Sequence, residues 1–136
     1  MEQIVQSLQT VTSFGMYFTA ALGLVVLFKF IYMMITPHNE MQLIRNGNIA
    51  AAAQYSGAIV GFTLPLASAI SHSVSLIDFT TWGAVALVVQ LLVFFVFSKI
   101  IVNASTHISN NNIAVGVLMG FISVAFGLIN AACMTY

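Results

Sequence analysis

Long apolar stretches separated by short polar segments dominate the chain. A helix that crosses the roughly 30 Å of membrane hydrocarbon needs about 20 mostly apolar residues. The four stretches that meet this requirement cover residues 14–35, 49–70, 82–102 and 113–134. Runs such as 91–97 are continuously apolar, whereas the strands of a membrane barrel alternate apolar and polar residues. The pattern therefore predicts an all-α membrane protein, with residues 1–136 forming a single integral membrane domain.

The segments between the predicted spans are short, so consecutive spans are expected to be antiparallel neighbours in a four-helix bundle. The two halves of the chain also resemble each other. Asn48-Ile49-Ala50 opens the second span and Asn112-Ile113-Ala114 opens the fourth, and each follows a span with a lysine near its end. We interpret this as two tandem helical hairpins, an internal repeat whose pseudo-symmetry axis lies along the membrane normal.

Composition excludes several classes of protein. The 136 residues are 60% hydrophobic and 4% charged, whereas a soluble domain carries about 25% charged residues. A soluble catalytic domain is therefore excluded. Three basic and three acidic side chains give no basic patch, so nucleic acid is not an expected partner. One cysteine and three scattered histidines form no ligand pattern, so no metal and no cofactor are expected. The expected contacts are membrane lipid and further copies of the chain in a homo-oligomer.

The basic residues predict the orientation, because lysine and arginine favour cytoplasmic loops. Lys29, Arg45 and Lys99 all fall on one side of a four-span arrangement. We therefore expect loops 36–48 and 103–112 in the cytoplasm and both termini in the periplasm.

Small residues recur about every four positions in the second and fourth spans. Positions i and i+4 share one helix face, and a face without large side chains lets two backbones approach closely. We expect these residues to pack helices, within the chain or between copies, or alternatively to line a pore. A proline inside the second span also predicts a local kink. The set comprises Ala53, Gly57, Gly61, Pro65, Gly116, Gly120, Ser123, Gly127 and Asn130.

Four long polar or charged side chains fall within the predicted spans. Gln54 and Gln90 are costly in lipid, so they are expected to bond across helices or to line a hydrated path. Lys29 lies about six residues from the end of its span, so its ammonium group either reaches the interface or turns inward. Lys99 is closer to the boundary and is expected to anchor there. Because no acidic residue falls inside a span, a carboxylate-based proton relay is not expected.

Loop 36–48 is the most polar segment and would supply the water-facing surface that the rest of the chain lacks. Residues 40–45 predict a short helix at the membrane interface, and Asn46 or Asn48 is expected to cap the second span. We expect any cytoplasmic protein partner to dock on this loop. The docking candidates are His38, Glu40, Arg45 and Asn48.

Three segments carry a family resemblance: Thr36-Pro37-His38-Asn39-Glu40, the stretch from Trp82-Gly83 through residues 86–94, and residues 130–135. Together they resemble the YjfL-like family of small bacterial inner-membrane proteins, whose function is uncharacterised. The resemblance covers essentially the whole chain. It implies a four-span protein of the bacterial cytoplasmic membrane, and it supplies no catalytic residue.

Two functions stay open. The first is a non-enzymatic multi-pass membrane protein that self-assembles through its small-residue faces and forms a pore or small channel. The alternative is an anchor or scaffold for a cytoplasmic partner in envelope maintenance, which the polar loop 36–48 favours. The spans contain no evident nucleophile–base pair and no carboxylate cluster, so an enzyme is not expected.

Overall fold

The computed structural model describes residues 1–134, and every element in that range is a helix. The elements are α1 (Glu2–Ile35), α2 (Glu40–Arg45), α3 (Ile49–His72), α4 (Leu76–Ile100), α5 (Ala104–Ser109) and α6 (Ile113–Ala132). The four longest, α1, α3, α4 and α6, are each long and apolar enough to cross a membrane. The predicted all-α class with four spans is therefore confirmed. The last two residues of the single domain predicted over 1–136 lie outside the described range.

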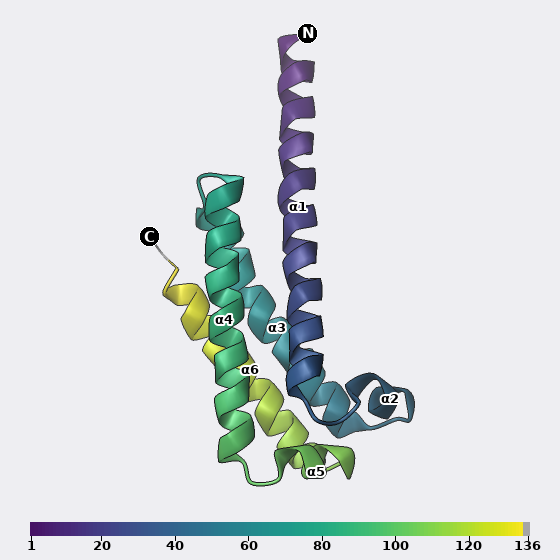
Figure 1. The fold of residues 1–136 in the computed structure, drawn as a ribbon. Helices are drawn as coiled ribbons and strands as arrows, with labels where there is room; N and C mark the ends of the chain where they lie inside the picture. The colour runs from purple at the N-terminus through teal and green to yellow at the C-terminus, as the bar shows by residue number, and fades with distance from the viewer. Residues whose placement is uncertain (135–136) are drawn as a thin grey trace.

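Consecutive long helices run in opposite directions. Figure 1 shows α1 and α4 running toward the end of the molecule that holds α2 and α5, and α3 and α6 running away from it. We call this the α2/α5 end. Each half of the chain thus runs long helix, short helix, long helix. That order alone does not test the predicted duplication, and the internal repeat stays a prediction.

Side-chain caps explain where the helices begin. Asn39, Asn48, Ser75 and Asn112 each precede a helix and accept a hydrogen bond from the backbone N–H three residues later. Such a cap satisfies one of the N–H groups that a helix start leaves unpaired. Gly47, between α2 and α3, adopts φ +85°, a left-handed conformation that favours glycine. The chain changes direction there. The predicted capping of the second span by Asn48 is confirmed.

Two helices begin several residues before the apolar stretches that they contain. Helix α1 begins at Glu2 rather than near residue 14. Its first turns contain Ser and Thr hydroxyls that donate to the carbonyl four residues earlier, for example Ser7 to Gln3 at 2.8 Å. These polar side chains are thus accommodated within the helix. Helix α4 begins at Leu76 rather than at residue 82.

The early start of α4 has a local cause. The Ser75 hydroxyl accepts from the Asp78 N–H at 3.1 Å, and the Asp78 carboxylate accepts from the Val74 N–H at 3.1 Å. The pair resembles a capping box, but the carboxylate accepts from the residue before the N-cap and not from the N-cap itself. The early start of α4 reduces the predicted loop 71–81 to the three residues 73–75.

Helices α3 and α6 form the most extensive helix contact, although they are not consecutive in the chain. Their glycines allow it. A Cβ on Gly57 would overlap the backbone of Gly120, and one on Gly127 would overlap the backbone of Gly61. Close backbone approach maximises dispersion contact, which drives helix association where the hydrophobic effect is absent. The packing that we expected mainly between consecutive spans is therefore dominated by this pair.

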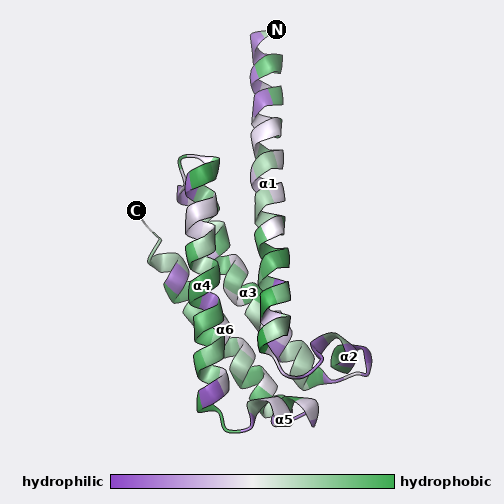
Figure 2. Cartoon of the chain, in the orientation of Figure 1, coloured by the Kyte–Doolittle hydropathy of each residue, from purple (hydrophilic) through white to green (hydrophobic). Residues whose placement is uncertain are grey.

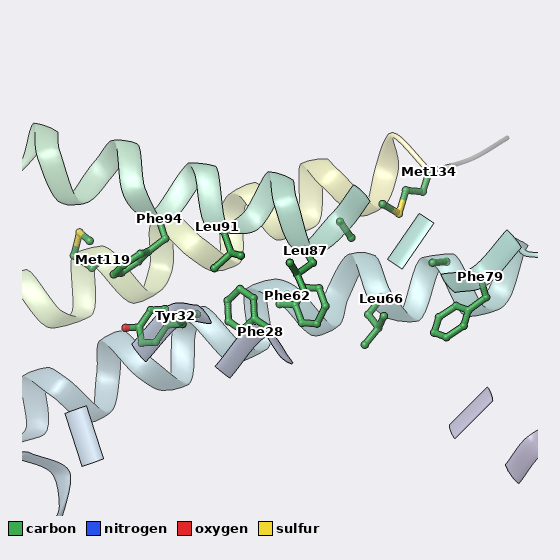
Figure 3. Packing of buried hydrophobic residues seen from close by; sticks show 13 residues of the cluster. Phe28, Tyr32, Phe62, Leu66, Phe79, Leu87, Leu91, Phe94, Met119 and Met134 are labelled. Carbon is green, nitrogen blue, oxygen red and sulfur yellow. The ribbon is translucent and has the colours of Figure 1, made fainter. Parts of the chain in front are cut away.

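Aromatic side chains from three helices fill the space beside that pair. Phe28 of α1 stacks on Phe62 of α3 with ring centroids 4.7 Å apart, and Tyr32 of α1 meets Phe94 of α4 at 4.6 Å. Figure 3 shows Tyr32, Phe28 and Phe62 beside one another, and the side chains that face them from α4 are Phe94, Leu91 and Leu87. This cluster holds α1 against the other helices at the α2/α5 end.

Apolar residues make up most of the four long helices (Figure 2), and many of their large side chains are exposed. Large side chains such as Leu92 and Phe121 are 57% and 70% exposed. In water such a surface would drive aggregation, whereas in hydrocarbon it costs nothing. The surface therefore agrees with a protein that spans a membrane.

Candidate functional site

A buried carboxylate lies at the α2/α5 end. Glu40 opens α2 and is 1% exposed, where α2 packs against α3 and the Glu40 side chain meets α1. The Tyr32 hydroxyl of α1 donates to Glu40 Oε1 at 2.9 Å. His38, in the turn between α1 and α2, places Nε2 2.9 Å from the same oxygen. Since a buried charge is costly unless it is paired and hydrogen-bonded, these two partners make its burial tolerable.

The hydrogen bonds continue from His38 to another helix. His38 Nδ1 lies 2.8 Å from the Ser105 hydroxyl oxygen at the start of α5. Ser105, His38, Glu40 and Tyr32 therefore form one connected chain of hydrogen bonds across α5, the α1–α2 turn, α2 and α1. We call these four residues the Glu40 cluster. Chemically, the cluster can move a proton between a hydroxyl and a carboxylate through an imidazole ring.

A cavity of about 580 Å³ adjoins the Glu40 cluster. It lies between the ends of α1 and α4, the first turns of α3, and α5. Apolar walls come mainly from Phe94, Phe95 and Ile35. The polar side chains in its lining are Thr36, His38, Gln54, Ser98, Lys99, Asn103, Ser105 and Thr106. His38 and Ser105 thus connect the cavity directly with the buried carboxylate.

Three buried side-chain atoms within the described range have no hydrogen-bond partner: Glu40 Oε2, Gln54 Oε1 and Gln90 Oε1. Each is an acceptor oxygen. Their depths differ, because Gln54 lies five residues into α3 and Gln90 lies ten residues before the end of α4. At 1.5 Å per residue these offsets are about 8 Å and about 15 Å from the α2/α5 end. The unpaired acceptors therefore occur at successive levels inside the helix assembly.

Two deeper amides contact backbone carbonyls of neighbouring helices. Gln90 Nε2 donates to the carbonyl of Ser123 in α6 at 3.1 Å. Asn130 Nδ2 of α6 donates to the carbonyl of Ala86 in α4 at 3.4 Å. These bonds connect α4 to α6 and leave the side-chain oxygen of Gln90 unpaired.

The small residues proposed from sequence lie mainly at the α3–α6 contact of one chain. A Cβ on Gly61 would lie 2.9 Å from Gln90 Nε2, and one on Gly120 would lie 2.5 Å from the Ala53 carbonyl oxygen. Gly116 faces Ala50 in the same way. Ser123 and Pro65 are buried beside them. On the outer side, Ala53, Gly57 and Gly120 border a shallow apolar groove of about 240 Å³.

The basic residues gather near the α2/α5 end but do not join the buried cluster. Lys29 is half-buried on α1, and Arg45 is exposed on α2. Lys99 is exposed on α4, with Nζ 5.4 Å from the centre of the Phe95 ring. Among residues 1–134, the one ion pair is His38–Glu40. All three basic residues therefore lie toward the same end of the structure, as expected. None of them forms a salt bridge with Glu40.

The expectation of a water-facing loop 36–48 is wrong in part. The short helix over residues 40–45 is confirmed, and Arg45 is exposed. Glu40, however, is buried, and Asn48 is 8% exposed because its amide donates to the Ile108 carbonyl at 2.8 Å. These two docking candidates therefore serve contacts within the chain.

The sequence also gave no sign of two members of the Glu40 cluster. Tyr32 and Ser105 are separated from Glu40 by 8 and 65 positions, and neither has a distinctive motif. The short helix α5 that carries Ser105 was not predicted. His107 lies apart from His38 and contacts Asn112 at 3.3 Å. No group of three or more His, Cys, Asp or Glu residues suited to a metal occurs among the described residues.

Comparisons with known proteins agree with one another. Residues 5–134 match a family model described as a Domain of Unknown Function, DUF350. The chain is 45% identical over 129 residues to the UPF0719 inner membrane protein YjfL of Escherichia coli K12, covering 95% of this chain and 98% of that protein. It is 30% identical over 118 residues to the UPF0719 transmembrane protein YshE of Bacillus subtilis 168, covering 85% and 88%. No solved structure matches. Both names refer to a membrane, and neither states an activity.

Proposed function

Because this chain belongs to the DUF350 family, whose description assigns no function, we propose from its own geometry that it is a small non-enzymatic pore of the bacterial inner membrane that conducts an inorganic cation or the proton. The observation that carries the proposal is the series of unpaired acceptor oxygens at three depths. The cavity of about 580 Å³ at the α2/α5 end supplies an entrance. The positive-inside rule puts that entrance in the cytoplasm and the termini in the periplasm.

The chemical type of the unpaired atoms favours cations. A buried acceptor without a donor costs about 1–3 kcal/mol, so three of them in 134 described residues call for a compensating group. Water and cations both supply what an oxygen acceptor lacks, and carbonyl or carboxylate oxygens are the groups that hard cations prefer. An anion would face an unpaired oxygen at each of these three positions, and Lys99, the lysine in the cavity lining, is exposed. The path is therefore suited to protons, hydrated cations and water.

The described conformation has α3 and α6 in close contact, so conduction requires a local opening. Pro65 provides a weak point within α3, because it has no N–H to donate to the Gly61 carbonyl. Gly61 is also where α3 meets Gly127 and Gln90. A bend at this turn would separate the two small-residue faces at the depth of the Gln90 oxygen. Kinks of this kind are tolerated in membrane helices because neighbouring groups satisfy the freed carbonyl.

Self-assembly needs a surface other than the small-residue faces, which α3 and α6 occupy within one chain. Helix α1 has 34 residues and is about 51 Å long, so it extends well beyond the other helices (Figure 1). Ile4, Leu8 and Val11 lie on one face of this extension at positions i, i+4 and i+7, and each is more than 60% exposed. Glu2 is the one charged side chain there. We place the contact with a second copy on this face.

The scaffold alternative rests on α2. Gln42 and Arg45 of α2 and its C-cap residue Asn46 are polar and exposed. A cytoplasmic protein would dock there. Capture of one defined partner that is lost in Arg45→Ala, together with proteoliposomes that are tight to all ions, would favour this alternative over the pore.

The test of the pore is a flux assay with the purified full chain in liposomes of bacterial lipid. Dyes or electrodes report movement of protons, K⁺, Na⁺ and Cl⁻ under an imposed gradient and membrane potential. The proposal predicts movement of at least one cation, no movement of Cl⁻, and a lower rate in Gln54→Leu. Gln9→Leu, which changes an exposed glutamine on the extension of α1, serves as the matched control. Liposomes that stay tight to every cation would refute the pore.

A further inference from the structure

The Glu40 cluster is a hydrogen-bonded path from the cavity to a buried carboxylate, and the proposed pore does not by itself explain it. Glu40 Oε1 has two partners, so this oxygen is not an open ligand for a hydrated metal cation. Tyr32 and His38 both bond Oε1. The imidazole stands between the cavity and the carboxylate, since His38 Nδ1 contacts Ser105 on one side and Nε2 contacts Glu40 on the other.

We propose that Glu40 is the proton-binding site of this protein, and that Ser105 and His38 deliver the proton to it from the cavity. This deepens the proposed function and rests on it for the conducted species, which it identifies as the proton. His38 is the proton carrier, and Tyr32 is a positioning residue that holds the carboxylate.

The transfer balances along the observed contacts. With Glu40 ionised, His38 Nε2–H donates to Oε1 and Nδ1 accepts from the Ser105 hydroxyl. A proton from hydronium in the cavity binds the Ser105 oxygen, while the hydroxyl proton of Ser105 passes to Nδ1 and the Nε2 proton passes to Oε1. The products are water, an intact serine hydroxyl, the other tautomer of neutral imidazole and a neutral carboxyl group. One proton enters and one carboxylate is neutralised.

The surroundings of the carboxyl group fit this role. Glu40 Oε2 is buried and has no partner, so a carboxyl group that rotates can present its proton on that side.

From α1 the titratable neighbour is Tyr32, and from α3 it is Tyr55, whose ring lies 5.8 Å from that of Tyr32. Lys99 of α4 lines the cavity but makes no ion pair with Glu40. From α5 the neighbouring group is the Ser105 hydroxyl, and Arg45 at the far end of α2 is exposed. No cation is paired with the carboxylate apart from a protonated His38, so proton binding need not break a salt bridge to lysine or arginine.

Hydroxyl, imidazole and carboxylate in this order also occur in serine hydrolases. Two features favour proton uptake here. The second carboxylate oxygen faces inward without a partner, and further unpaired acceptors, Gln54 Oε1 and Gln90 Oε1, follow at greater depth. A nucleophile mechanism would leave all three of these atoms without a role.

The test combines infrared spectroscopy with flux measurements on the full chain in liposomes. A pH titration of the wild type should show the carboxylic acid C=O band of a buried group, and this band should be absent in Glu40→Gln. Proton flux should be lost in Glu40→Gln. In His38→Phe it should fall about 100-fold, the lower end of what a positioned proton-transfer group contributes to a rate. Ser105→Ala, which removes one atom, should lower the rate less, and Gln42→Ala on the exposed side of α2 should leave it unchanged.

The possible results separate this inference from the pore. Movement of K⁺ or Na⁺ without movement of protons would leave the pore standing and overturn the inference. A Glu40 band that titrates in tight liposomes would support the proton site and refute the pore. The infrared spectra of wild type and Glu40→Gln are also compared over pH. If their difference contains no titrating carboxyl band, the inference is overturned whatever the flux. Circular dichroism and gel filtration establish that each variant is folded.

Discussion

Replacing Gln54 by leucine separates the roles that a buried glutamine can have. Gln54 is 2% exposed, makes no hydrogen bond in the structure, and lines the cavity. If it served to hold the helices together, its loss would destabilise the fold. If it serves as an acceptor for a passing ion or water, its unpaired oxygen lowers the free energy of unfolding. An apolar residue of similar volume would then restore that stability.

The magnitude follows from the unpaired oxygen. A buried acceptor without a partner costs about 1–3 kcal/mol relative to an apolar replacement. At the low end, about 1 kcal/mol of added stability corresponds to a rise of about 4 °C in the midpoint of thermal unfolding for a chain of this size. We therefore expect Gln54→Leu to unfold at an equal or higher temperature than the wild type, followed by circular dichroism in detergent. We expect the same variant to conduct cations more slowly.

Two outcomes would refute this reasoning. A loss of more than about 1 kcal/mol, the net worth of an ordinary hydrogen bond, would mean that Gln54 stabilises the helices through a bond. Unchanged flux in a stable Gln54→Leu protein would mean that this oxygen does not lie on the conducting path. Gln9→Leu, on an exposed turn of α1, controls for the added hydrophobicity.

The remaining predictions concern the framework that carries the site. Gly57→Ala should destabilise the protein by about 1–3 kcal/mol, because its Cβ overlaps the Gly120 backbone; Gly23→Ala, which has no atom within 4 Å, should be neutral or stabilising by thermal unfolding. Asn48→Ala should cost about 0.5–2 kcal/mol through loss of the α3 cap and should speed amide exchange in α5, since Asn48 also holds the Ile108 carbonyl; unchanged exchange would contradict that link. In a Cys133→Ser background, Leu8→Cys should form a disulfide-linked dimer in membranes and Gln6→Cys should not; equal crosslinking of both would remove the α1 contact.

The sequence was sufficient for the membrane class because hydropathy depends on composition over about 20 residues and not on any one contact. The family resemblance drawn from the 36–40 loop and residues 82–94 is confirmed by the family model over 5–134 and by the relatives. Helix ends were less predictable where polar residues continue a helix. Ser75 followed three residues later by Asp78 is the sequence signal that would have predicted the start of α4.

The buried carboxylate could not be predicted from sequence, because its burial depends on how α2 packs. Glu40 lies in a polar loop outside every predicted span, and such residues are usually solvated. Its partners are Tyr32 near the end of α1 and His38 in the following turn, and His38 in turn contacts Ser105 of α5, 65 positions from Glu40. Only the folded arrangement brings Tyr32, His38 and Ser105 together around it. Carboxylates are absent from the predicted spans, but Glu40 is buried at the end of the assembly, outside those spans.

The proposed pore is tested most directly by a density map of the protein in a lipid nanodisc at a resolution that shows ordered water and ions. We expect density within hydrogen-bonding distance of the three unpaired oxygens, Glu40 Oε2, Gln54 Oε1 and Gln90 Oε1. Side chains that have turned to find protein donors, with no density beside any of the three oxygens, would contradict it.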